Sequence, residues 1–282
     1  MDVQNRVAVI TGSGSGIGEA LAKAFALSGA RHVVVADLDG SAAERVAREI
    51  TATGGSASAA SVDAAVEAKV VDLVESTESS RGPIDIFVSN AGYVTVAGLE
   101  DPNASIQRMW EVHVMAHIYA ARAVIPSMAA RGEGYLLNTA SAAGLLSQIG
   151  SMSYTVTKHA AVALAEWLAI SHHHQGIRVS VLCPQAVRTN IIANSPDRVP
   201  GQAVGIDDFG VAAADGIVEA DDVAQLCIEA MAEERFHILP HPEVGEYIKM
   251  KAADPDRWLS AMRKFQSRLH GDGQLPGDEI LS

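Results

Sequence analysis

The chain has 282 residues, of which 48% are hydrophobic, and its 34 acidic and 21 basic residues give a net charge of −13 at pH 7. This length suits one α/β domain with a large core, while the acidic balance excludes a nucleic-acid backbone as partner, because such a partner needs a basic face. No apolar stretch reaches the roughly 20 residues that span a bilayer and no secretory signal opens the chain, so we predict a cytoplasmic protein that does not enter membranes.

The first predicted elements are a strand, a glycine-rich turn and a helix. The apolar run 7–10 leads into Thr-Gly-Ser-Gly-Ser-Gly-Ile-Gly at residues 11–18, and a helical pattern begins near Gly16. Glycine lets a phosphate approach the backbone closely, and the free amides at the start of the helix hold the anion. Asp37 ends the next apolar run, where a carboxylate can bind a ribose hydroxyl. Together these features predict a dinucleotide site rather than a surface turn.

Strands and helices alternate along the rest of the chain. The patterns predict strands at 56–61, 84–89, 135–139, 178–183 and 236–239, and helices at 41–53, 65–81, 105–130, 153–174 and 221–233. Ser41 with Glu44 predicts a capping box at the start of the first of these helices. The alternation predicts a Rossmann-type, doubly wound parallel sheet of about seven strands in three α/β/α layers. Ligands bind such sheets at the carboxyl ends of the strands.

Two segments interrupt this alternation. Residues 190–220 carry two prolines and four glycines, and a stretch that long between a strand and a helix predicts a substrate lid, with a disordered loop as the alternative. Residues 240–282 form a C-terminal helical extension of the single domain, whose main part spans residues 1–239. Apolar residues recur in the extension at helical spacing: Trp258, Leu259, Met262, Phe265 and Leu269. Packing on the body of the protein is the simpler role for this face, and covering the active site or contacting another subunit is the alternative.

Three side chains form a candidate catalytic set. Tyr154 and Lys158 are four residues apart in a predicted helix and therefore share one face. A tyrosine is a poor base at neutral pH because its pKa is about 10, and a nearby ammonium lowers that value. Ser141 follows the predicted strand 135–139, where its hydroxyl can polarise a substrate carbonyl. Such a Tyr and Lys alone would be an ordinary amphipathic pair, but after a nucleotide loop and a strand-end serine they predict catalysis.

With these motifs, from Arg6 to about Leu239, the chain resembles the branch of the short-chain dehydrogenase/reductase family that has TGxxxGxG and YxxxK motifs. The resemblance implies hydride transfer between a nicotinamide and the carbon of a secondary alcohol or ketone, on a mostly apolar substrate. Tyr154 would be the general acid or base, and Ser141 would orient and polarise the substrate oxygen. Lys158 would bind the nicotinamide ribose and lower the tyrosine pKa.

The resemblance also implies which residues bind the cofactor. Asn90, Ala91 and Gly92 match the NAG motif of the family, whose Asn supports the central sheet and borders the cofactor. Asp63 matches the acid that meets adenine. The segment that holds the nicotinamide carboxamide is matched by Pro184, Val187 and Thr189. The other predicted cofactor contacts are Gly12, Ser15, Gly16, Ile17, Gly18, Asp37, Leu38, Tyr154 and Lys158.

The chain departs from the family pattern at three positions. His113 stands nine residues before Arg122, where the family has an Asn that holds a water linking the Lys to solvent. An imidazole can donate or accept a hydrogen bond, so we add His113 to the catalytic set and expect it to change the pH dependence. A different water path and a partly impaired enzyme are the alternatives. Gln185 replaces the usual Gly near the nicotinamide, and Ser89 replaces an Asn with little expected consequence.

The residues around the ribose site indicate the choice of cofactor. Asp37 can accept a hydrogen bond from the 2′-hydroxyl of NAD but repels the 2′-phosphate of NADP. Relatives that prefer NADP commonly carry a basic residue at the positions of Ser15 or Leu38, so we predict NAD(H). The alternatives are an NADP(H)-dependent 3-oxoacyl-type reductase and a catalytically impaired NAD-binding regulator.

No metal site is predicted. The three histidines 172–174 are adjacent at a helix end and point in different directions, which makes them poor common ligands. His237 and His241 are interpreted as packing or rim residues. The predicted partner is a small-molecule alcohol or ketone, and the resemblance implies a homodimer or homotetramer.

Overall fold

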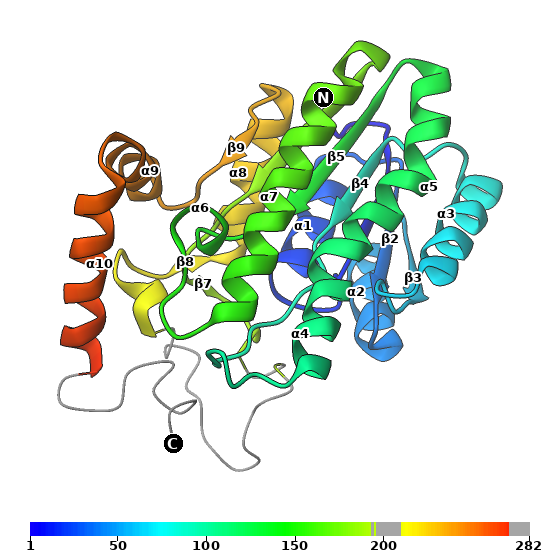
Figure 1. Ribbon diagram of the computed structural model, residues 1–282. Helices are drawn as coiled ribbons and strands as arrows, with labels where there is room; N and C mark the ends of the chain where they lie inside the picture. The colour runs from blue at the N-terminus through cyan, green and yellow to red at the C-terminus, as the bar shows by residue number, and fades with distance from the viewer. Residues whose placement is uncertain (193–194, 196–209, 271–282) are drawn as a thin grey trace.

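A computed structural model describes residues 1–192, 195 and 210–270 of the chain (Figure 1). Seven parallel strands form its main sheet in the order β3-β2-β1-β4-β5-β6-β9. Their bounds are β1 (Val7–Thr11), β2 (His32–Asp37), β3 (Ala57–Ser61), β4 (Ile86–Ser89), β5 (Gly134–Thr139), β6 (Ile177–Leu182) and β9 (His237–Ile238). The chain changes direction across the sheet between β1 and β4, and such a switch point is where this architecture binds nucleotides.

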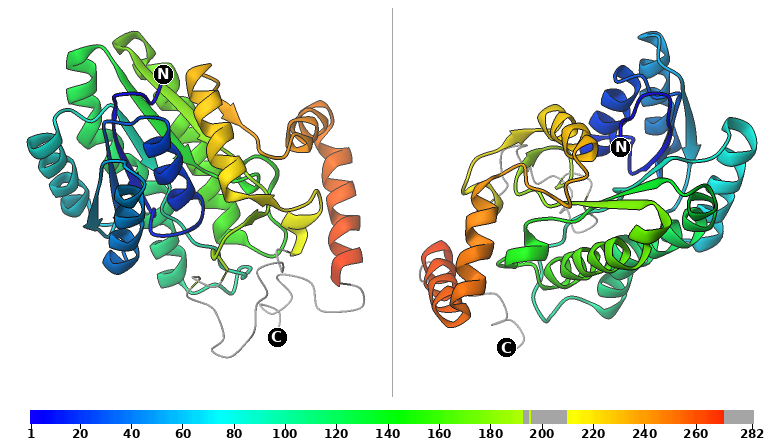
Figure 2. Two further views of the ribbon diagram at one scale, coloured as in Figure 1. Left: turned by 180° about the vertical axis from the view of Figure 1, so that it is seen from behind. Right: turned by 90° about the horizontal axis from the view of Figure 1, so that it is seen from above.

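Three helices cover each face of this sheet (Figure 2). On one face lie α1 (Gly16–Leu27), α2 (Gly40–Ala52) and α8 (Ala220–Ala232); on the other lie α3 (Glu67–Arg81), α5 (Ala116–Arg131) and α7 (Met152–His172). Successive strand residues point to opposite faces, so Ala8 and Ile10 pack with the first group while Val7 and Val9 pack with the second. The predicted doubly wound, three-layer sheet of seven strands is confirmed.

The start of α2 differs from the predicted capping box of Ser41 and Glu44. Asp39 is the N-cap residue, and its Oδ1 accepts hydrogen bonds from the backbone amides of Ser41 (2.9 Å) and Ala42 (3.2 Å). The Ser41 hydroxyl itself donates to the same carboxylate. The predicted capping box is therefore wrong, because the helix begins two residues earlier and the Ser41 hydroxyl donates to Asp39 instead of accepting from an amide of the first turn.

The predicted helix 105–130 is divided into three parts. α4 (Asn103–Trp110) leads into a π-helical turn, η1 (Glu111–Met115), and α5 follows directly. A π-turn inserts an extra residue into the helix and is frequent at functional sites. Here it contains His113, one of the predicted site residues. At the other end of the sheet, α7 passes into a single 3-10 turn, η2 (His173–Gln175), which ends at Gly176.

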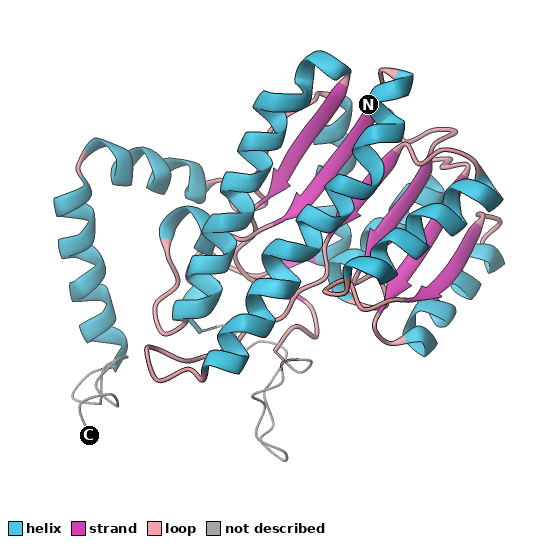
Figure 3. Ribbon diagram, turned by 45° about the vertical axis from the view of Figure 1, so that its right-hand side comes forward, coloured by secondary structure: helices cyan, strands magenta, loops and turns pink. Residues whose placement is uncertain are grey.

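The remaining elements surround the carboxyl edge of the sheet. They are the short helix α6 (Ala143–Leu146), the 3-10 turn η3 (Gly210–Ala213), a two-stranded parallel sheet of β7 (Val187–Arg188) and β8 (Val218–Glu219), α9 (Glu243–Ala253) and α10 (Pro255–His270). Most of the predicted lid lies outside the described residues. Figure 3 shows α10 standing apart from the sheet and its layers of helices, joined to them through α9. Within the described ranges, no helix combines the length and apolarity needed to cross a bilayer.

Candidate active site

A cavity of about 1240 Å³ opens at the carboxyl ends of the parallel strands. Its wall contains every predicted cofactor and catalytic residue except Gly18 and His113, which lie directly behind it. The cavity continues from the glycine loop to the apolar face of α10. The topology of the sheet thus brings together residues that are 177 positions apart in the sequence, such as Gly12 and Thr189.

The glycine loop between β1 and α1 is packed too closely for side chains at two of its positions. A Cβ on Gly12 would lie 2.7 Å from Ala91 Cα, and Gly12 also has a φ of +64°. A Cβ on Gly18 would lie 2.2 Å from the carbonyl oxygen of Gly12. Ser15 is the N-cap residue of α1 and makes no side-chain capping bond. The first amides of α1 therefore remain available to an anion in the cavity, as dinucleotide phosphates require.

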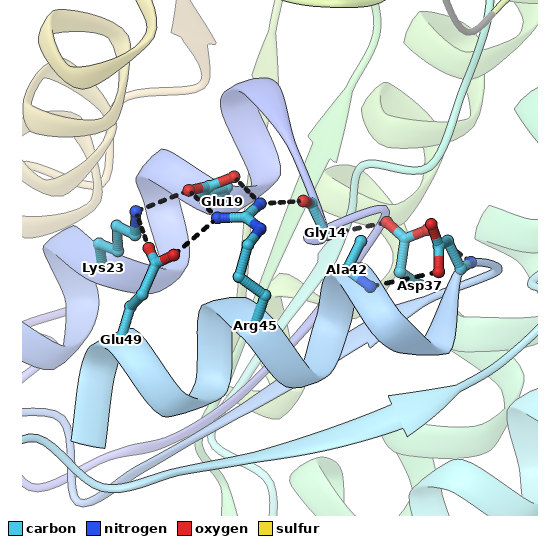
Figure 4. A network of polar contacts seen from close by, with 8 residues as sticks. Gly14, Glu19, Lys23, Asp37, Ala42, Arg45 and Glu49 are labelled. Atoms are coloured by element: carbon cyan, nitrogen blue, oxygen red, sulfur yellow. Dashed lines mark hydrogen bonds and ion pairs between the residues drawn. The ribbon is translucent and has the colours of Figure 1, made fainter. Parts of the chain in front are cut away.

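The end of β2 holds this loop through a carboxylate. Asp37 Oδ2 accepts a hydrogen bond from the Gly14 amide (2.8 Å), and Oδ1 accepts one from the Asp39 amide (3.0 Å). Gly14 is also held through its carbonyl oxygen, which accepts a hydrogen bond from Arg45 of α2 (2.8 Å), as Figure 4 shows. The next residue, Leu38, is 67% exposed on the cavity wall. This end of the cavity thus presents a carboxylate and an apolar side chain.

Asn90 ties together the ends of three strands. Its Nδ2 donates to the carbonyls of Thr11 and Gly12 (3.1 Å each), and its Oδ1 accepts a hydrogen bond from Thr139 Oγ1 (3.1 Å). The geometry matches the supporting role that the NAG motif implies. Asp63, by contrast, is held by an ion pair with Arg108 (2.9 Å), a residue that the sequence patterns did not single out. A carboxylate so engaged keeps lone pairs for a ligand but carries little free charge.

Ser141, Tyr154 and Lys158 meet at the wall between the glycine loop and the apolar end of the cavity. Ser141 Oγ donates to the Pro184 carbonyl (3.3 Å), and it also forms a hydrogen bond with the Tyr154 hydroxyl. Lys158 Nζ lies 5.6 Å from the centroid of the Tyr154 ring and donates to the Thr139 carbonyl (3.0 Å). Because α7 presents Tyr154 and Lys158 one turn apart and β5 ends beside them, the three predicted side chains form one cluster.

The electrostatics of this cluster are governed by burial. Burial raises the pKa of Tyr154, against the lowering effect of its hydrogen bond with Ser141. Burial also lowers the pKa of Lys158 to about 8. Desolvation of the phenolate is the largest effect on Tyr154, while Lys158 directs its ammonium to the Thr139 carbonyl. The lowering of the tyrosine pKa by the Lys158 ammonium therefore stays a prediction.

His113 lies behind the cluster and is fully buried. Its Nε2 accepts a hydrogen bond from the Tyr93 amide (3.2 Å), so the ring proton is on Nδ1, which donates to Thr157 Oγ1 (3.0 Å). Its ring meets the Tyr154 ring edge-on at a centroid distance of 5.5 Å. Burial and the nearby Lys158 hold the pKa of His113 well below its ordinary value. The imidazole is therefore neutral, with both nitrogens hydrogen-bonded to protein groups.

Two polar groups beside the cluster were missed from the sequence. His117, one turn after His113, donates from Nδ1 to Asn138 Oδ1 (3.0 Å) and is 1% exposed. The four-residue spacing from His113 could have placed it on the same helix face. The second group is Asp215, which accepts hydrogen bonds from Gln185 and Tyr247. Gln185, Asp215 and Tyr247 come from segments that are distant in the sequence, so no sequence spacing could have revealed this group of three residues. Within the described residues, no cluster of three or more His, Cys, Asp or Glu is arranged to hold a metal.

The chain is similar to known proteins over most of its length. The family model described as short chain dehydrogenase matches residues 6–199. The chain is 35% identical over 262 residues to 1-deoxy-11-beta-hydroxypentalenate dehydrogenase of Streptomyces exfoliatus, covering 92% of this chain and 90% of the relative. It is 34% identical over 190 residues to 7alpha-hydroxysteroid dehydrogenase of Escherichia coli K12, covering 67% and 74%. A short chain dehydrogenase/reductase of Burkholderia phymatum, solved in complex with NAD, superposes with a TM-score of 0.82 at 31% identity, covering 91% and 96%.

The chain therefore belongs to the short-chain dehydrogenase/reductase family, as the motifs predicted. It is an oxidoreductase of the kind that acts on hydroxyl and ketone groups with a nicotinamide cofactor.

Proposed function

We propose that the protein is an NAD(H)-dependent dehydrogenase that interconverts a secondary alcohol and a ketone on a mostly apolar substrate. The observation that carries this proposal is the cluster of Ser141, Tyr154 and Lys158 between the glycine loop and the apolar end of one cavity. The glycine loop, the free amides of α1 and the Asp37 carboxylate fit a dinucleotide.

In this proposal each side chain of the cluster has one task. The nicotinamide, when bound, supplies or accepts the hydride. Ser141 donates its hydroxyl hydrogen to the substrate oxygen and so polarises the bond to carbon. Tyr154 exchanges a proton with that oxygen from its phenolic hydroxyl, as acid in ketone reduction and as base in alcohol oxidation. Lys158 holds the ribose hydroxyls with its ammonium, and its bond to the Thr139 carbonyl orients it.

The preference for NAD(H) over NADP(H) is supported by the residues at the end of β2. Asp37 presents a carboxylate where a 2′-phosphate would lie, and Ser15 and Leu38 supply no positive charge there. Comparison of kcat/KM with the two cofactors tests this choice. We expect a clear excess with NAD, and a ratio that favours NADP would refute it.

The substrate class is supported by the lining of the cavity and by relatives. Apolar residues of the loop after β7 and of α10 face the cavity near Tyr154, among them Ile191, Ile192, Met262 and Phe265. The relatives are named for a hydroxypentalenate and a hydroxysteroid, two bulky alicyclic alcohols. We therefore infer that this chain oxidises or forms a bulky alicyclic secondary alcohol.

The decisive experiment is a screen of secondary alcohols, from cyclohexanol to hydroxysteroids, with NAD and detection of NADH by its absorbance. We expect the wild type to oxidise a bulky alcohol. We expect Tyr154→Phe to lose this activity while it still binds NADH. Failure to oxidise any of them despite tight NADH binding would favour the impaired regulator instead.

We also infer that the protein acts as a homodimer or homotetramer in the cytoplasm. Free, buried cysteines support a reducing compartment, because burial raises the pKa of Cys183 and of Cys227 to about 12 and keeps both as thiols. The exposed apolar side chains on α7 support an assembly.

A further inference from the structure

Three polar side chains form a cluster in the apolar part of the cavity wall. Gln185 Nε2 donates to Asp215 Oδ2 (2.9 Å), and the Tyr247 hydroxyl donates to Asp215 Oδ1 (3.0 Å). We call these three residues the Asp215 latch. All of them line the cavity. One carboxylate thus joins three segments that are distant in sequence: the loop after β6, the turn before β8, and α9.

The chemistry of the latch fixes the orientation of its amide. A carboxylate only accepts hydrogen bonds, so the amide nitrogen of Gln185 must face Asp215. The Gln185 Oε1 is then buried, and among the described residues it has no hydrogen-bond partner. An unpartnered buried carbonyl is unfavourable, so the bond to Asp215 dominates the position of this side chain. The backbone amide of Gln185 is held separately by His241 Nδ1 (3.3 Å).

Tyr247 is a stable donor to the latch. Burial and the Asp215 carboxylate both raise the pKa of Tyr247, so its hydroxyl keeps its proton. The same ring also packs against Trp258, at a centroid distance of 6.2 Å. Trp258 is the first residue of the apolar face of α10 that lines the cavity. Tyr247 therefore contacts both Asp215 and the α10 side of the cavity.

The position of α10 depends on α9, its main packing partner. α9 has two further attachments to the body: Val244 packs with Ala142 and Leu146, and Lys251 Nζ donates to the Leu145 carbonyl (2.7 Å). Both attachments lead to α6. The latch ties α9 itself to the loop that follows β6 and leads to Val187 and Thr189, and the bond from the Gln185 amide to His241, just before α9, adds a second link to the same loop.

We propose that Asp215 is a positioning residue that selects substrates by size, because it fixes α9 and α10 relative to Ser141, Tyr154 and Lys158. The inference rests on the proposed alcohol dehydrogenase function and names the element that sets its specificity. Binding of a bulky alcohol that reaches α10 depends on the latch. Binding of a small alcohol that occupies only the space beside Tyr154 does not.

Two substitutions at this position separate the hydrogen bonds from the charge. Asp215→Ala removes both bonds. Asp215→Asn keeps both, because Oδ1 still accepts from Tyr247 while Nδ2 donates to Gln185 Oε1 once that amide has turned over. Glu246→Ala is the matched control, since it removes an exposed carboxylate from the same helix, next to Tyr247.

The test is steady-state oxidation of cyclohexanol and of a hydroxysteroid with NAD. We expect Asp215→Ala to raise the KM of the hydroxysteroid about tenfold, as the loss of one to two hydrogen bonds implies. The KM of cyclohexanol and both kcat values should change by less than about twofold. Asp215→Asn and Glu246→Ala should behave like the wild type. Equal changes of both KM values in Asp215→Ala, or failure of Asp215→Asn to restore the hydroxysteroid KM, would overturn the proposal.

Hydrogen–deuterium exchange supplies a readout that does not depend on turnover. In Asp215→Ala without substrate, we expect faster exchange of residues 243–270 and unchanged exchange of β1, β4 and β5. If neither alcohol is oxidised but exchange accelerates as expected, the proposed function fails while the latch stands. Unchanged exchange of α9 and α10 would refute the latch itself.

Discussion

At the scale of single residues, two buried histidines lie near Lys158. His113 and His117 lie one helical turn apart, and burial together with the nearby Lys158 lowers the pKa of both. Each ring is held by a protein group, His113 by Thr157 and Tyr93 and His117 by Asn138. Burial therefore holds both imidazoles in the neutral form.

The structure gives a direction to the pH effect expected of His113. In His113→Asn the shorter side chain spans only one of the two hydrogen bonds and leaves more room for water beside the Tyr154 ring. Better solvation of the phenolate counteracts the burial that raises the tyrosine pKa. We expect activity to be retained and the pH–rate profile of alcohol oxidation to move to lower pH. Complete loss of activity, or movement to higher pH, would contradict this assignment.

His117 makes stability depend on pH. Its folded pKa is lowered to about 3 by burial, whereas an unfolded histidine has a pKa of about 6.5. As the pH falls below about 6.5, the unfolded chain binds the proton first, so the stabilisation present above that pH is progressively lost down to the folded pKa.

Between about pH 7.5 and about pH 5, this histidine accounts for a loss of about 2 kcal/mol in the free energy of unfolding. Urea titrations at the two pH values should therefore show that His117→Gln loses about 2 kcal/mol less than the wild type. His174→Gln, which alters an exposed histidine of η2, should keep the wild-type loss. An identical pH dependence in His117→Gln and the wild type would show that the residue is not buried in neutral form.

The proximity of the three proposed catalytic residues could be predicted from the sequence, but several of their neighbours could not. Tyr154 and Lys158 are close because a helix converts a spacing of four into proximity, and Ser141 follows a recognisable strand. Asp215, in contrast, meets Gln185 and Tyr247 only through the tertiary fold. The sign of the Tyr154 pKa shift was also out of reach, because it depends on the degree of burial.

At the scale of elements, α1 and α2 are joined by a network of charges behind the glycine loop (Figure 4). Arg45 pairs with Glu19 (2.7 Å) and Glu49 (3.0 Å), and Lys23 pairs with the same two carboxylates (2.6 Å each). Through its bond to the Gly14 carbonyl, Arg45 connects this network to the loop. The network therefore holds the loop in the conformation that leaves the α1 amides free.

Removal of this connection should weaken cofactor binding. In Arg45→Ala the Gly14 carbonyl loses its donor, and the loop must be ordered by the ligand. We expect the Kd of NADH, measured by fluorescence titration, to rise about threefold to tenfold, which corresponds to the loss of one net hydrogen bond. Arg48→Ala removes an exposed cation that pairs only with Glu44 among the described contacts and should leave the Kd unchanged. Equal Kd values for Arg45→Ala and Arg48→Ala would refute the supporting role.

The order and type of the elements could be predicted far better than their ends. Apolar runs revealed the central strands of the main sheet, since these are buried between two layers of helices, whereas the edge strand β3 is only half-buried. Apolar periodicity did not reveal the π-turn at 111–115, because one inserted residue barely disturbs a helical pattern. Nor did it place the cap of α2, where Asp39 and Ser41 both offer suitable oxygens and geometry selects Asp39.

At the scale of the whole molecule, α7 carries two of the proposed catalytic residues on one face and exposed apolar residues on another. Tyr154 and Lys158 point to the cavity, while Val156, Trp167 and Ile170 are 50%, 58% and 80% exposed. The spacing of these three residues places them along one stripe of the helix. Large apolar side chains gathered in this way are typical of a protein contact surface.

We therefore expect this stripe to form the contact between copies of the chain in the proposed dimer or tetramer. Ile170→Glu would place a charge in that contact without disturbing the core, because the residue is 80% exposed. We expect Ile170→Glu to have a smaller mass than the wild type by light scattering after size-exclusion chromatography, and to keep the circular dichroism spectrum of the wild type. Leu27→Glu is the matched control, since Leu27 is a comparably exposed apolar residue (78%) on α1, away from the stripe. A monomeric wild type, or the same mass for Ile170→Glu, Leu27→Glu and the wild type, would refute α7 as the contact.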